Sequence, residues 1–500
     1  MMPMFLRIAA CAGVLAISLP AQAPSTRLNP TVQQITDAIS EERIAENLKK
    51  LEGFGTRYIL SSDDDPVHGI GAAKRWLYSQ FQSYSPRLEV SYQNFRIKKG
   101  ARRGQVLREV QLSNVVAVLP GTIDKDRFVL ITGHYDSVHL QRKPQFTEAE
   151  RLADLVKRGM EENEAKRYMQ LFPTEETLGE VDAERTAADP AAPGVTDDGS
   201  GTAAVLETAR VMSGYHFDKT VIFVAFAGEE IGLEGSKAYA TSAKDKSMQI
   251  EAVLNNDIIG SDVSGNGRSS NSTLRMFAVG PEDSPSRALL RYAKHVAELY
   301  VPSMKVDPIF RGDRFNRGGD QLSFTTQGYA AVRLTTPSEN FENQHSGTDT
   351  FANTSAPYTT RVTRMNAAVL ASLALAPAPP VLNWTFLSGE RKGDRLPLLS
   401  RGKSGYDAVM RWQPSPEPDI AGYAVVIRST TSPDWKKEIW VGNVTSYTIA
   451  NFSIDDVVIG VKAVDRDGNE SMVSSYLEPV NLQLTAPPAA PATATPPASK

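Results

Sequence analysis

One stretch of the sequence constrains the fold of this chain more than any other. Residues 194–201 read Gly-Val-Thr-Asp-Asp-Gly-Ser-Gly, an apolar helical pattern follows, and residues 220–230 read Thr-Val-Ile-Phe-Val-Ala-Phe-Ala-Gly-Glu-Glu. The run from Val221 to Phe226 is apolar without alternation, which is typical of a strand buried on both faces of a parallel sheet. Ser200 and Asp198 are good N-cap residues for the helix that precedes this strand. The stretch therefore predicts a helix and a buried strand of an α/β sheet.

Acidic pairs flank this helix and strand. Asp197 and Asp198 come just before the helix, and Glu229 and Glu230 come just after the strand. In an open α/β sheet, ligands bind at the carboxyl ends of the strands. Buried carboxylates repel one another strongly unless a cation lies between them. A metal ion is the simplest such cation, so we expect a metal site at this edge of the sheet.

Further side chains of the metal-ligand type lie at the ends of other predicted strands or in the loops after them: His134, Asp136, Asp257 and His345. Because His134 and Asp136 are two residues apart, they point to the same face of a strand. A carboxylate beside a ligating imidazole fixes the tautomer and the orientation of the ring. Mixed imidazole and carboxylate donors suit zinc, with manganese or cobalt as alternatives.

Two histidines and three carboxylates exceed the needs of one tetrahedral site, but they fill two sites if one carboxylate is shared: His134, Asp197, Glu230, Asp257 and His345. Paired metals of this kind hold a hydroxide nucleophile and polarise a carbonyl together. Glu229, next to a predicted ligand, is then the general base that takes the proton from water.

Each signal also has a structural explanation when it is taken alone. A His-x-Asp pair is often a surface hydrogen bond, and Asp-Asp-Gly is often a turn. Their recurrence at successive strand ends favours a metal site. His139 is the rival ligand that lies near the site in sequence. Ser137 and Ser200 do not lie in a G-x-S-x-G motif, so no serine hydrolase is predicted.

Composition and targeting signals limit the function further. Residues 1–23 show a short basic region, an apolar core and an Ala-x-Ala site, which predict a signal peptide and a secreted or periplasmic protein. The apolar run is too short to span a membrane, so we expect no stable membrane insertion. Cys11, the single cysteine, lies in that peptide, so the mature chain forms no disulfide. The net charge of -4 without a basic run argues against nucleic acid as a partner.

The remaining residues divide into parts by their patterns. Strands alternating with helices over 28–375 predict an α/β fold, a mainly parallel mixed sheet with helices on both faces. Charged residues at helical spacing over about 144–187 predict a solvated helical insert. A Pro/Ala linker at 376–384 precedes short strands over 385–483, which predict an all-β sandwich. The Ala/Pro tail at 484–500 has nothing to bury, and we expect it to be disordered.

At these motifs the chain resembles the co-catalytic dizinc aminopeptidases related to bacterial leucyl aminopeptidase and aminopeptidase Y. The resemblance covers roughly residues 40–375 and consists of ordered motifs: His134-Tyr135-Asp136-Ser137, Asp197 to Gly201, Glu229-Glu230, Asp257 and His345. It implies the zinc exopeptidase fold, two Zn²⁺ ions per chain, and removal of N-terminal residues from peptide or protein substrates.

The resemblance also implies a role for each matched residue. His134 and Asp257 would hold one zinc, Glu230 and His345 the other, and Asp197 would bridge the two metals. Asp136 and Glu229 would be the catalytic pair, Asp136 orienting His134 and Glu229 acting as the base.

Two positions depart from the family. Gln321 stands where relatives often have a histidine that is not a ligand, and Gln344 stands where some have a tyrosine that helps to stabilise the oxyanion. The C-terminal part resembles fibronectin type III, with Trp412 and Tyr423 at the expected core positions. That resemblance implies tethering or docking on a substrate or partner.

Other functions remain open at this point. A carboxypeptidase or a glutaminyl cyclase on the same fold is the enzymatic alternative, and the Asp-Asp-Gly-Ser-Gly motif favours two metals over the single zinc of the cyclase. A binding protein without catalysis is the other alternative. A missing base or ligand would favour it, and none is missing here.

Overall fold

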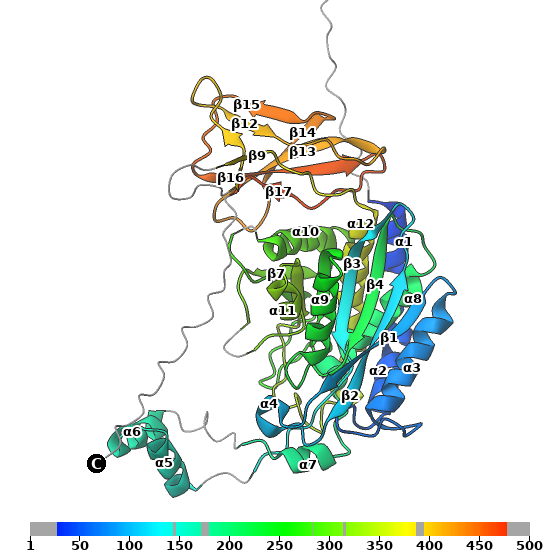
Figure 1. Cartoon of the computed structure of the whole chain (residues 1–500), viewed down its shortest axis with the longest axis vertical. Helices are drawn as coiled ribbons and strands as arrows, with labels where there is room; N and C mark the ends of the chain where they lie inside the picture. The colour runs from blue at the N-terminus through cyan, green and yellow to red at the C-terminus, as the bar shows by residue number, and fades with distance from the viewer. Residues whose placement is uncertain are drawn as a thin grey trace, which may run out of the picture.

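A computed structural model of the chain describes residues 28–143, 147–171, 180–282, 284–313, 317–386 and 395–477. It consists of a large α/β part and a smaller all-β part at one end (Figure 1). The predicted signal peptide and C-terminal tail lie outside the described residues. None of the helices in the described part of the chain combines the length and apolarity that a membrane span requires.

Eight strands form the central sheet, in the order β1-β2-β4-β3-β5-β8-β6-β7. They are β1 (Glu89–Ile97), β2 (Val110–Leu119), β3 (Asp124–His134), β4 (Lys219–Phe226), β5 (Gln249–Asn256), β6 (Thr273–Phe277), β7 (Lys305–Ile309) and β8 (Ala331–Thr335). The central pairs β4–β3, β3–β5 and β5–β8 are parallel, as is β6–β7. The pairs β1–β2, β2–β4 and β6–β8 are antiparallel. The predicted mainly parallel mixed sheet is confirmed.

Strand β4 is buried on both faces, as its continuous apolar run predicts. All of its residues are buried. Val221 and Phe223 belong to one core cluster, whereas Ile222 and Val224 belong to the other. Because alternate side chains of a strand point to opposite faces, each face of β4 contacts a different layer of helices.

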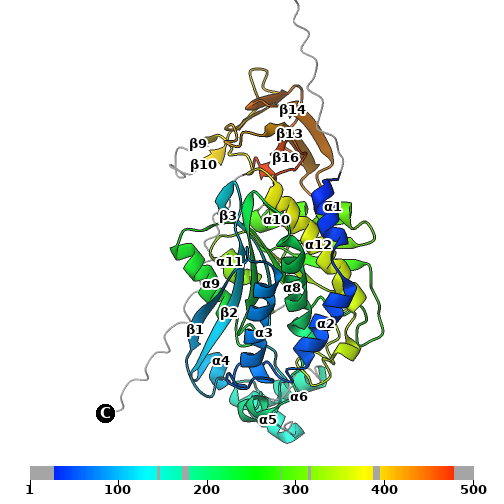
Figure 2. The ribbon, with the colours of Figure 1, turned by 90° about the vertical axis from the view of Figure 1, so that its right-hand side faces the viewer.

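Helices cover both faces of the sheet. The larger core cluster lies under α1 (Pro30–Asp37), α2 (Glu41–Glu52), α3 (Gly69–Tyr84), α8 (Ser200–Met212), α10 (Pro285–Tyr300) and α12 (Ala356–Leu375). Figure 2 faces the side that carries most of these helices. The smaller cluster lies under α9 (Glu234–Asp245) and α11 (Gln321–Thr326). The parallel strands β3, β4, β5 and β8 end at the same edge of the sheet.

Short helices occupy two connections near this edge. α4 (Ala101–Gly104) joins β1 to β2. Between β3 and α8 lie α5 (Glu148–Lys157), α6 (Glu162–Leu171) and α7 (Ala183–Ala188). In α5 and α6 only Leu155 and Ala165 are buried, so these charged helices pack on each other and face solvent. They fall within the predicted insert, whose limits stay a prediction.

Antiparallel sheets make up the C-terminal part. They contain β9 (Trp384–Phe386), β10 (Arg395–Pro397), β11 (Leu399–Ser400), β12 (Ala408–Arg411), β13 (Ile420–Ser429), β14 (Lys437–Gly442), β15 (Ser446–Ile449), β16 (Val457–Asp465) and β17 (Ser474–Ser475). The sheets β11-β12-β15 and β14-β13-β16-β17 share one core cluster. Within it the rings of Trp412 and Tyr423 lie 5.4 Å apart. The likeness to fibronectin type III and the limits at 376–384 and 385–483 stay predictions.

The C-terminal sheets pack against the end of the α/β part that lies away from the strands' carboxyl ends (Figure 1). Arg291 of α10 donates a hydrogen bond to the carbonyl of Pro433 at 3.1 Å, and Lys294 pairs with Asp434 at 3.3 Å. Met472 belongs to the larger core cluster of the α/β part. The two parts therefore share polar contacts and some apolar surface.

Candidate metal centre

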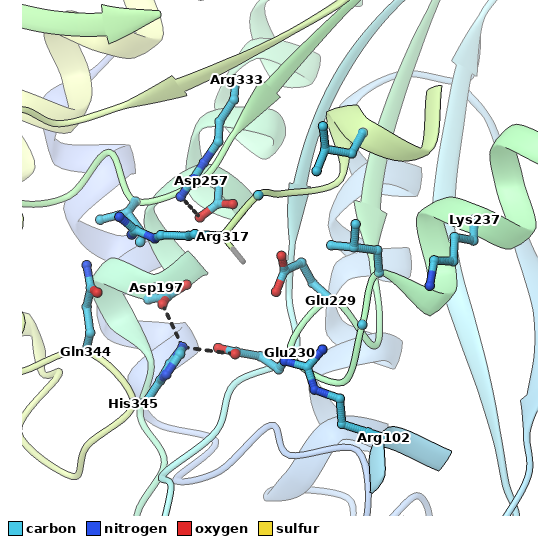
Figure 3. A pocket seen from close by; sticks show the side chains of 15 residues that line it. Arg102, Asp197, Glu229, Glu230, Lys237, Asp257, Arg317, Arg333, Gln344 and His345 are labelled. Carbon is cyan, nitrogen blue, oxygen red and sulfur yellow. Dashed lines mark ion pairs between the residues drawn. The ribbon is translucent and has the colours of Figure 1, made fainter. Parts of the chain in front are cut away.

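The residues that the sequence predicts for the site meet at the carboxyl edge of the central sheet, and Figure 3 shows five of them: Asp197, Glu229, Glu230, Asp257 and His345. His134 and Asp136 lie at the end of β3, and Asp197 lies in the turn Val195–Gly199 before α8. Glu229 and Glu230 follow β4, Asp257 follows β5, and His345 lies in the loop after β8. Five connections far apart in the sequence thus contribute to one cleft.

Five of these side chains form two donor groups. His134, Asp197 and Asp257 make one group, and Asp197, Glu230 and His345 make the other. Within each group one donor atom per residue lies within 4.8 Å of the others. His345 Nε2 is 3.2 Å from Asp197 Oδ2 and 3.0 Å from Glu230 Oε2. His134 Nε2 is 3.3 Å from Asp197 Oδ1, so Asp197 directs one oxygen to each group.

Two donor atoms of the cluster lack a hydrogen-bond partner, which fits a metal site. His134 Nε2 and Glu230 Oε1 are buried and have no hydrogen-bond partner among the described residues. Buried polar atoms are nearly always hydrogen-bonded, so such atoms need an explanation. Both atoms belong to residues of the donor groups, where a metal ion would bind them directly.

The buried charges of the cluster also favour a cation. Burial lowers the pKa of His134, but its contacts with Asp136 and Asp197 raise it more, so that it lies well above its ordinary value. Burial likewise lowers the pKa of His345, and the charges of Glu230 and Asp197 raise it well above its ordinary value. The carboxylates thus stabilise positive charge on the imidazoles. A metal ion would supply that charge and leave the rings neutral, as ligation requires.

Asp136 contacts more than the histidine. His134 Nδ1 is 3.1 Å from the backbone oxygen of Asp136 and 3.5 Å from its Oδ1. The carboxylate accepts hydrogen bonds from the amides of Glu229 at 3.2 Å and Glu230 at 3.3 Å. Asp136 therefore links the end of β3 to the loop after β4, a contact that spacing along the chain did not predict.

Asp198 is not in either donor group, yet it joins three of the segments that carry donors. Its carboxylate accepts hydrogen bonds from the amides of His134 at 3.1 Å, Ile258 at 3.1 Å and Gly201 at 2.9 Å. The expectation that Ser200 caps α8 is wrong. Ser200 is the first residue of the helix, and its hydroxyl instead bonds the carbonyl of Thr196 at 2.7 Å. Asp198 satisfies the free Gly201 amide in its place.

Arg57 and Asp349, which the sequence analysis missed, hold the turn that carries Asp197. The Asp349 carboxylate accepts hydrogen bonds from the amides of Thr196 and Asp197, both at 2.9 Å. The fully buried Arg57 donates to the carbonyls of Leu51, Tyr135, Pro193 and Gly194. Burial lowers the pKa of Arg57 to about 10, so it stays charged near neutral pH. Asp349 lies four residues after His345 in the same loop, which is the one local signal for it.

Two arginines neutralise the opposite wall of the cleft. Arg333, 1% exposed, lies 3.1 Å from Asp257 Oδ1 and 2.6 Å from Asp313 Oδ2. Arg317 pairs with Glu339. Gln344 lines the cleft and donates to Glu339 at 3.1 Å.

The two remaining sequence positions lie off the cleft wall. Gln321 is buried and accepts a hydrogen bond from Asn255 at 3.2 Å. His139 pairs with Asp189 at 3.2 Å and lies outside both donor groups, so it does not compete as a ligand.

Comparisons with known proteins identify related sequences and structures. The model of peptidase family M28 matches residues 114–370. A probable zinc metalloprotease of Pyrenophora tritici-repentis is 33% identical over 91% of this chain and 88% of its own length. A probable zinc metalloprotease of Leptosphaeria maculans is 32% identical over 88% of this chain and 95% of its own. Among solved structures, the LapA aminopeptidase of Legionella pneumophila matches 74% of this chain and 80% of its own at 18% identity, with a TM-score of 0.48.

Proposed function

The chain belongs to peptidase family M28, and we propose that it is a zinc-dependent aminopeptidase that removes N-terminal residues from peptides or proteins. The observation that carries this proposal is the pair of donor groups that share Asp197. A carboxylate shared by two sets of donors can hold two metal ions close together. Zinc is supported by the imidazole and carboxylate donors and by the relatives, which are described as probable zinc metalloproteases.

In this proposal each donor group holds one ion. His134 and Asp257 would hold one zinc, Glu230 and His345 would hold the other, and Asp197 would contribute to both. When bound, the zinc ions supply Lewis-acid polarisation of the scissile carbonyl and a water of lowered pKa. Asp136 and Asp198 hold the backbone of the donor segments, so the donor atoms are positioned before the metals arrive.

Glu229 is the residue to which we assign proton transfer. Its side chain lines the cleft beside both donor groups and belongs to neither. A carboxylate in this position can accept a proton from the attacking water and pass it to the leaving amine. Its amide donates to Asp136 Oδ1, so Asp136 positions the base as well as His134.

The alternatives differ from this proposal in what they require. A glutaminyl cyclase with a single zinc does not need the second donor group, and a binding protein without catalysis needs neither the full ligand set nor the base. A carboxypeptidase needs the same metals, so only the substrate separates it from an aminopeptidase.

Substrate profiling of the full-length metal-loaded protein tests the proposal. We would offer one peptide sequence with a free amine, with an acetylated amine, and with an amidated C-terminus, and identify the products by mass spectrometry. We expect loss of N-terminal residues from the first and third peptides, and no reaction of the second. Release of C-terminal residues from the acetylated peptide would make the protein a carboxypeptidase. Conversion of N-terminal glutamine to pyroglutamate without hydrolysis would make it a cyclase.

Metal analysis of the same sample tests the dizinc centre. We expect about two zinc ions per chain in active protein, because the two donor groups share only Asp197. One zinc ion per chain in fully active protein would contradict the two-metal proposal. The products of the peptide assay would still show whether the protein is a peptidase.

We also propose that the protein is secreted or periplasmic, and that the C-terminal sheets form a fibronectin type III-like domain that docks on a substrate or partner. The predicted signal peptide supports export. N-terminal sequencing of the native protein tests it, and an intact Met1 at the mature N-terminus would contradict export by this signal.

A further inference from the structure

The cleft is lined by four cationic side chains in two pairs. Arg317 and Arg333 line the wall on the Asp257 side, whereas Arg102 and Lys237 lie on the side of Glu229 and Glu230 (Figure 3). The cleft has a volume of about 480 Å³, which is enough for a short peptide segment. The two pairs differ in how far the protein itself neutralises them.

The pair on the Asp257 side is neutralised. Arg333 lies against Asp257 and Asp313, and Arg317 pairs with Glu339. An arginine that already contacts buried carboxylates has few donors left for a substrate. These two arginines therefore hold the wall of the cleft in place.

Arg102 is different, because its guanidinium makes no hydrogen bond or ion pair with any residue in the described ranges. It is exposed in the turn α4 between β1 and β2. Its Nη1 lies 3.5 Å from the place that a Cβ on Gly232 would take. The guanidinium thus lies over the loop that directly follows Glu230, at the mouth of the cleft.

Lys237 lies in the first turn of α9, on the same side of the cleft as Arg102 (Figure 3). Its ammonium is 3.5 Å from Glu234, and its side chain is 57% exposed. An exposed pair at this distance contributes little and leaves the lysine available to another anion. Arg102 and Lys237 together thus place two available cations on one side of the mouth of the cleft.

The charge balance of the cleft favours an anionic group in the substrate. Four carboxylates line it, namely Asp197, Glu229, Glu230 and Asp257, against the same number of cationic side chains. Glu339 and Asp313 already balance Arg317 and Arg333, and two divalent ions held by the donor groups would balance the four carboxylates, so the charges of Arg102 and Lys237 would remain. Guanidinium groups bind carboxylates through paired, charge-assisted hydrogen bonds.

We propose that Arg102, with Lys237, binds a carboxylate of the substrate, so that the protein prefers short peptides carrying a negative charge near the scissile bond. This inference rests on the proposed function. Two sources supply the same chemistry: the C-terminal carboxylate of a di- or tripeptide, and the side chain of an aspartate or glutamate. The cation pair adjoins the loop that carries Glu229, so the carboxylate it holds lies a short distance from the reacting centre.

Matched peptides separate the two sources. Leu-Gly is compared with Leu-Gly amide for the C-terminal carboxylate, and Leu-Glu amide with Leu-Gln amide for the side chain. We expect the charged member of at least one pair to have a kcat/KM about 10-fold higher, mainly through KM, because a charge-assisted hydrogen bond is lost in the neutral member. High salt should reduce this preference, since the groups are exposed.

Arg102→Gln should abolish most of the preference, by lowering kcat/KM for the charged peptides more than for the neutral ones. Arg103→Gln is the matched control, because Arg103 is also exposed and has a φ of 55° against 51° for Arg102, but it does not line the cleft. Equal kcat/KM for both members of both pairs in the wild type would overturn the inference. An equal loss of preference in both variants would overturn it as well.

A binding measurement keeps this inference separate from the proposed function. Acetyl-Leu-Gly and its amide, and acetyl-Leu-Glu amide and acetyl-Leu-Gln amide, are titrated into the wild type and the Arg102→Gln variant by calorimetry. We expect tighter binding of a charged member by the wild type alone. If that result is obtained while no peptide loses its N-terminal residue, the proposed function fails and the carboxylate site stands. Equal binding within both pairs together with N-terminal release overturns the carboxylate site alone.

Discussion

Replacing Arg57 tests whether one buried cation holds the donor segments together. Its side chain is 0% exposed and donates to four carbonyls, at 2.6 Å from Tyr135, 3.0 Å from Leu51, 2.5 Å from Pro193 and 2.8 Å from Gly194. In Arg57→Met the carbonyls of Tyr135 and Pro193 lose their hydrogen bond at about 1–3 kcal/mol each, whereas those of Leu51 and Gly194 keep the amides of Phe54 and Gly199. The sum, about 2–6 kcal/mol, is a large part of the stability of a typical domain, which is about 5–15 kcal/mol.

Arg57→Lys keeps the charge and separates packing from hydrogen bonding. The ammonium has three donors, so we expect it to satisfy some of the four carbonyls and to lower the free energy of unfolding by about 2–4 kcal/mol. The segments at Tyr135 and Gly194 flank donors of both groups, so zinc affinity should fall as well. Denaturant unfolding of the metal-free chain and zinc titration of the folded variant measure the two effects.

Two results would refute this reasoning. If Arg57→Met lowers the free energy of unfolding by less than about 1 kcal/mol, the carbonyls find other partners. Arg57→Lys that loses stability but binds zinc as tightly as the wild type would show that Arg57 supports the fold without positioning the donors. Arg96→Met is the control, because the Arg96 side chain is 71% exposed and pairs with the exposed Glu109.

Three further predictions concern the candidate metal site, the junction between the α/β part and the C-terminal sheets, and the charges at that junction. Glu229→Gln should lower kcat by about 10²–10⁴-fold with zinc content retained, whereas Glu230→Gln should lose zinc. Metal analysis together with kinetics distinguishes the two variants. A nearly fully active Glu229→Gln would show that another group transfers the proton. A chain ending at Ala376 keeps every cleft residue but exposes the surface that Met472 covers. We therefore expect a reduced yield of soluble protein that still hydrolyses a small aminoacyl substrate. A soluble, zinc-loaded but inactive product would contradict this prediction. Burial, then nearby carboxylates of the C-terminal part, raise the pKa of Asp218 to about 6, above its unfolded value. The contribution of Asp218 to stability therefore falls as pH rises through the window from about 4 to 6. Asp218→Asn should stabilise the protein more at pH 7 than at pH 4, and equal effects in thermal unfolding at the two pH values would refute this prediction.

Local sequence was enough to predict the buried sheet and most of the candidate donors. The apolar run of β4 reports burial on both faces, because the period of a strand is two and both sets of its side chains are apolar. Since parallel strands end at one edge of a sheet, acidic residues and histidines after β3, β4 and β5 had to be neighbours. The order of the motifs added the ligand roles by resemblance.

Tertiary structure decided the contacts that support those donors. Arg57 donates to a carbonyl 137 residues away, and Asp349 accepts from an amide 152 residues away, so neither partner has a signature in local spacing. The same holds for Asp198, which looked like a helix cap and in fact ties three segments together. The position of Arg102 at the cleft depends on how the β1–β2 turn lies over the loop after β4. Side-chain periodicity shows which face a residue points to, whereas the packing of the whole chain determines which buried carbonyls, amides and charges it meets.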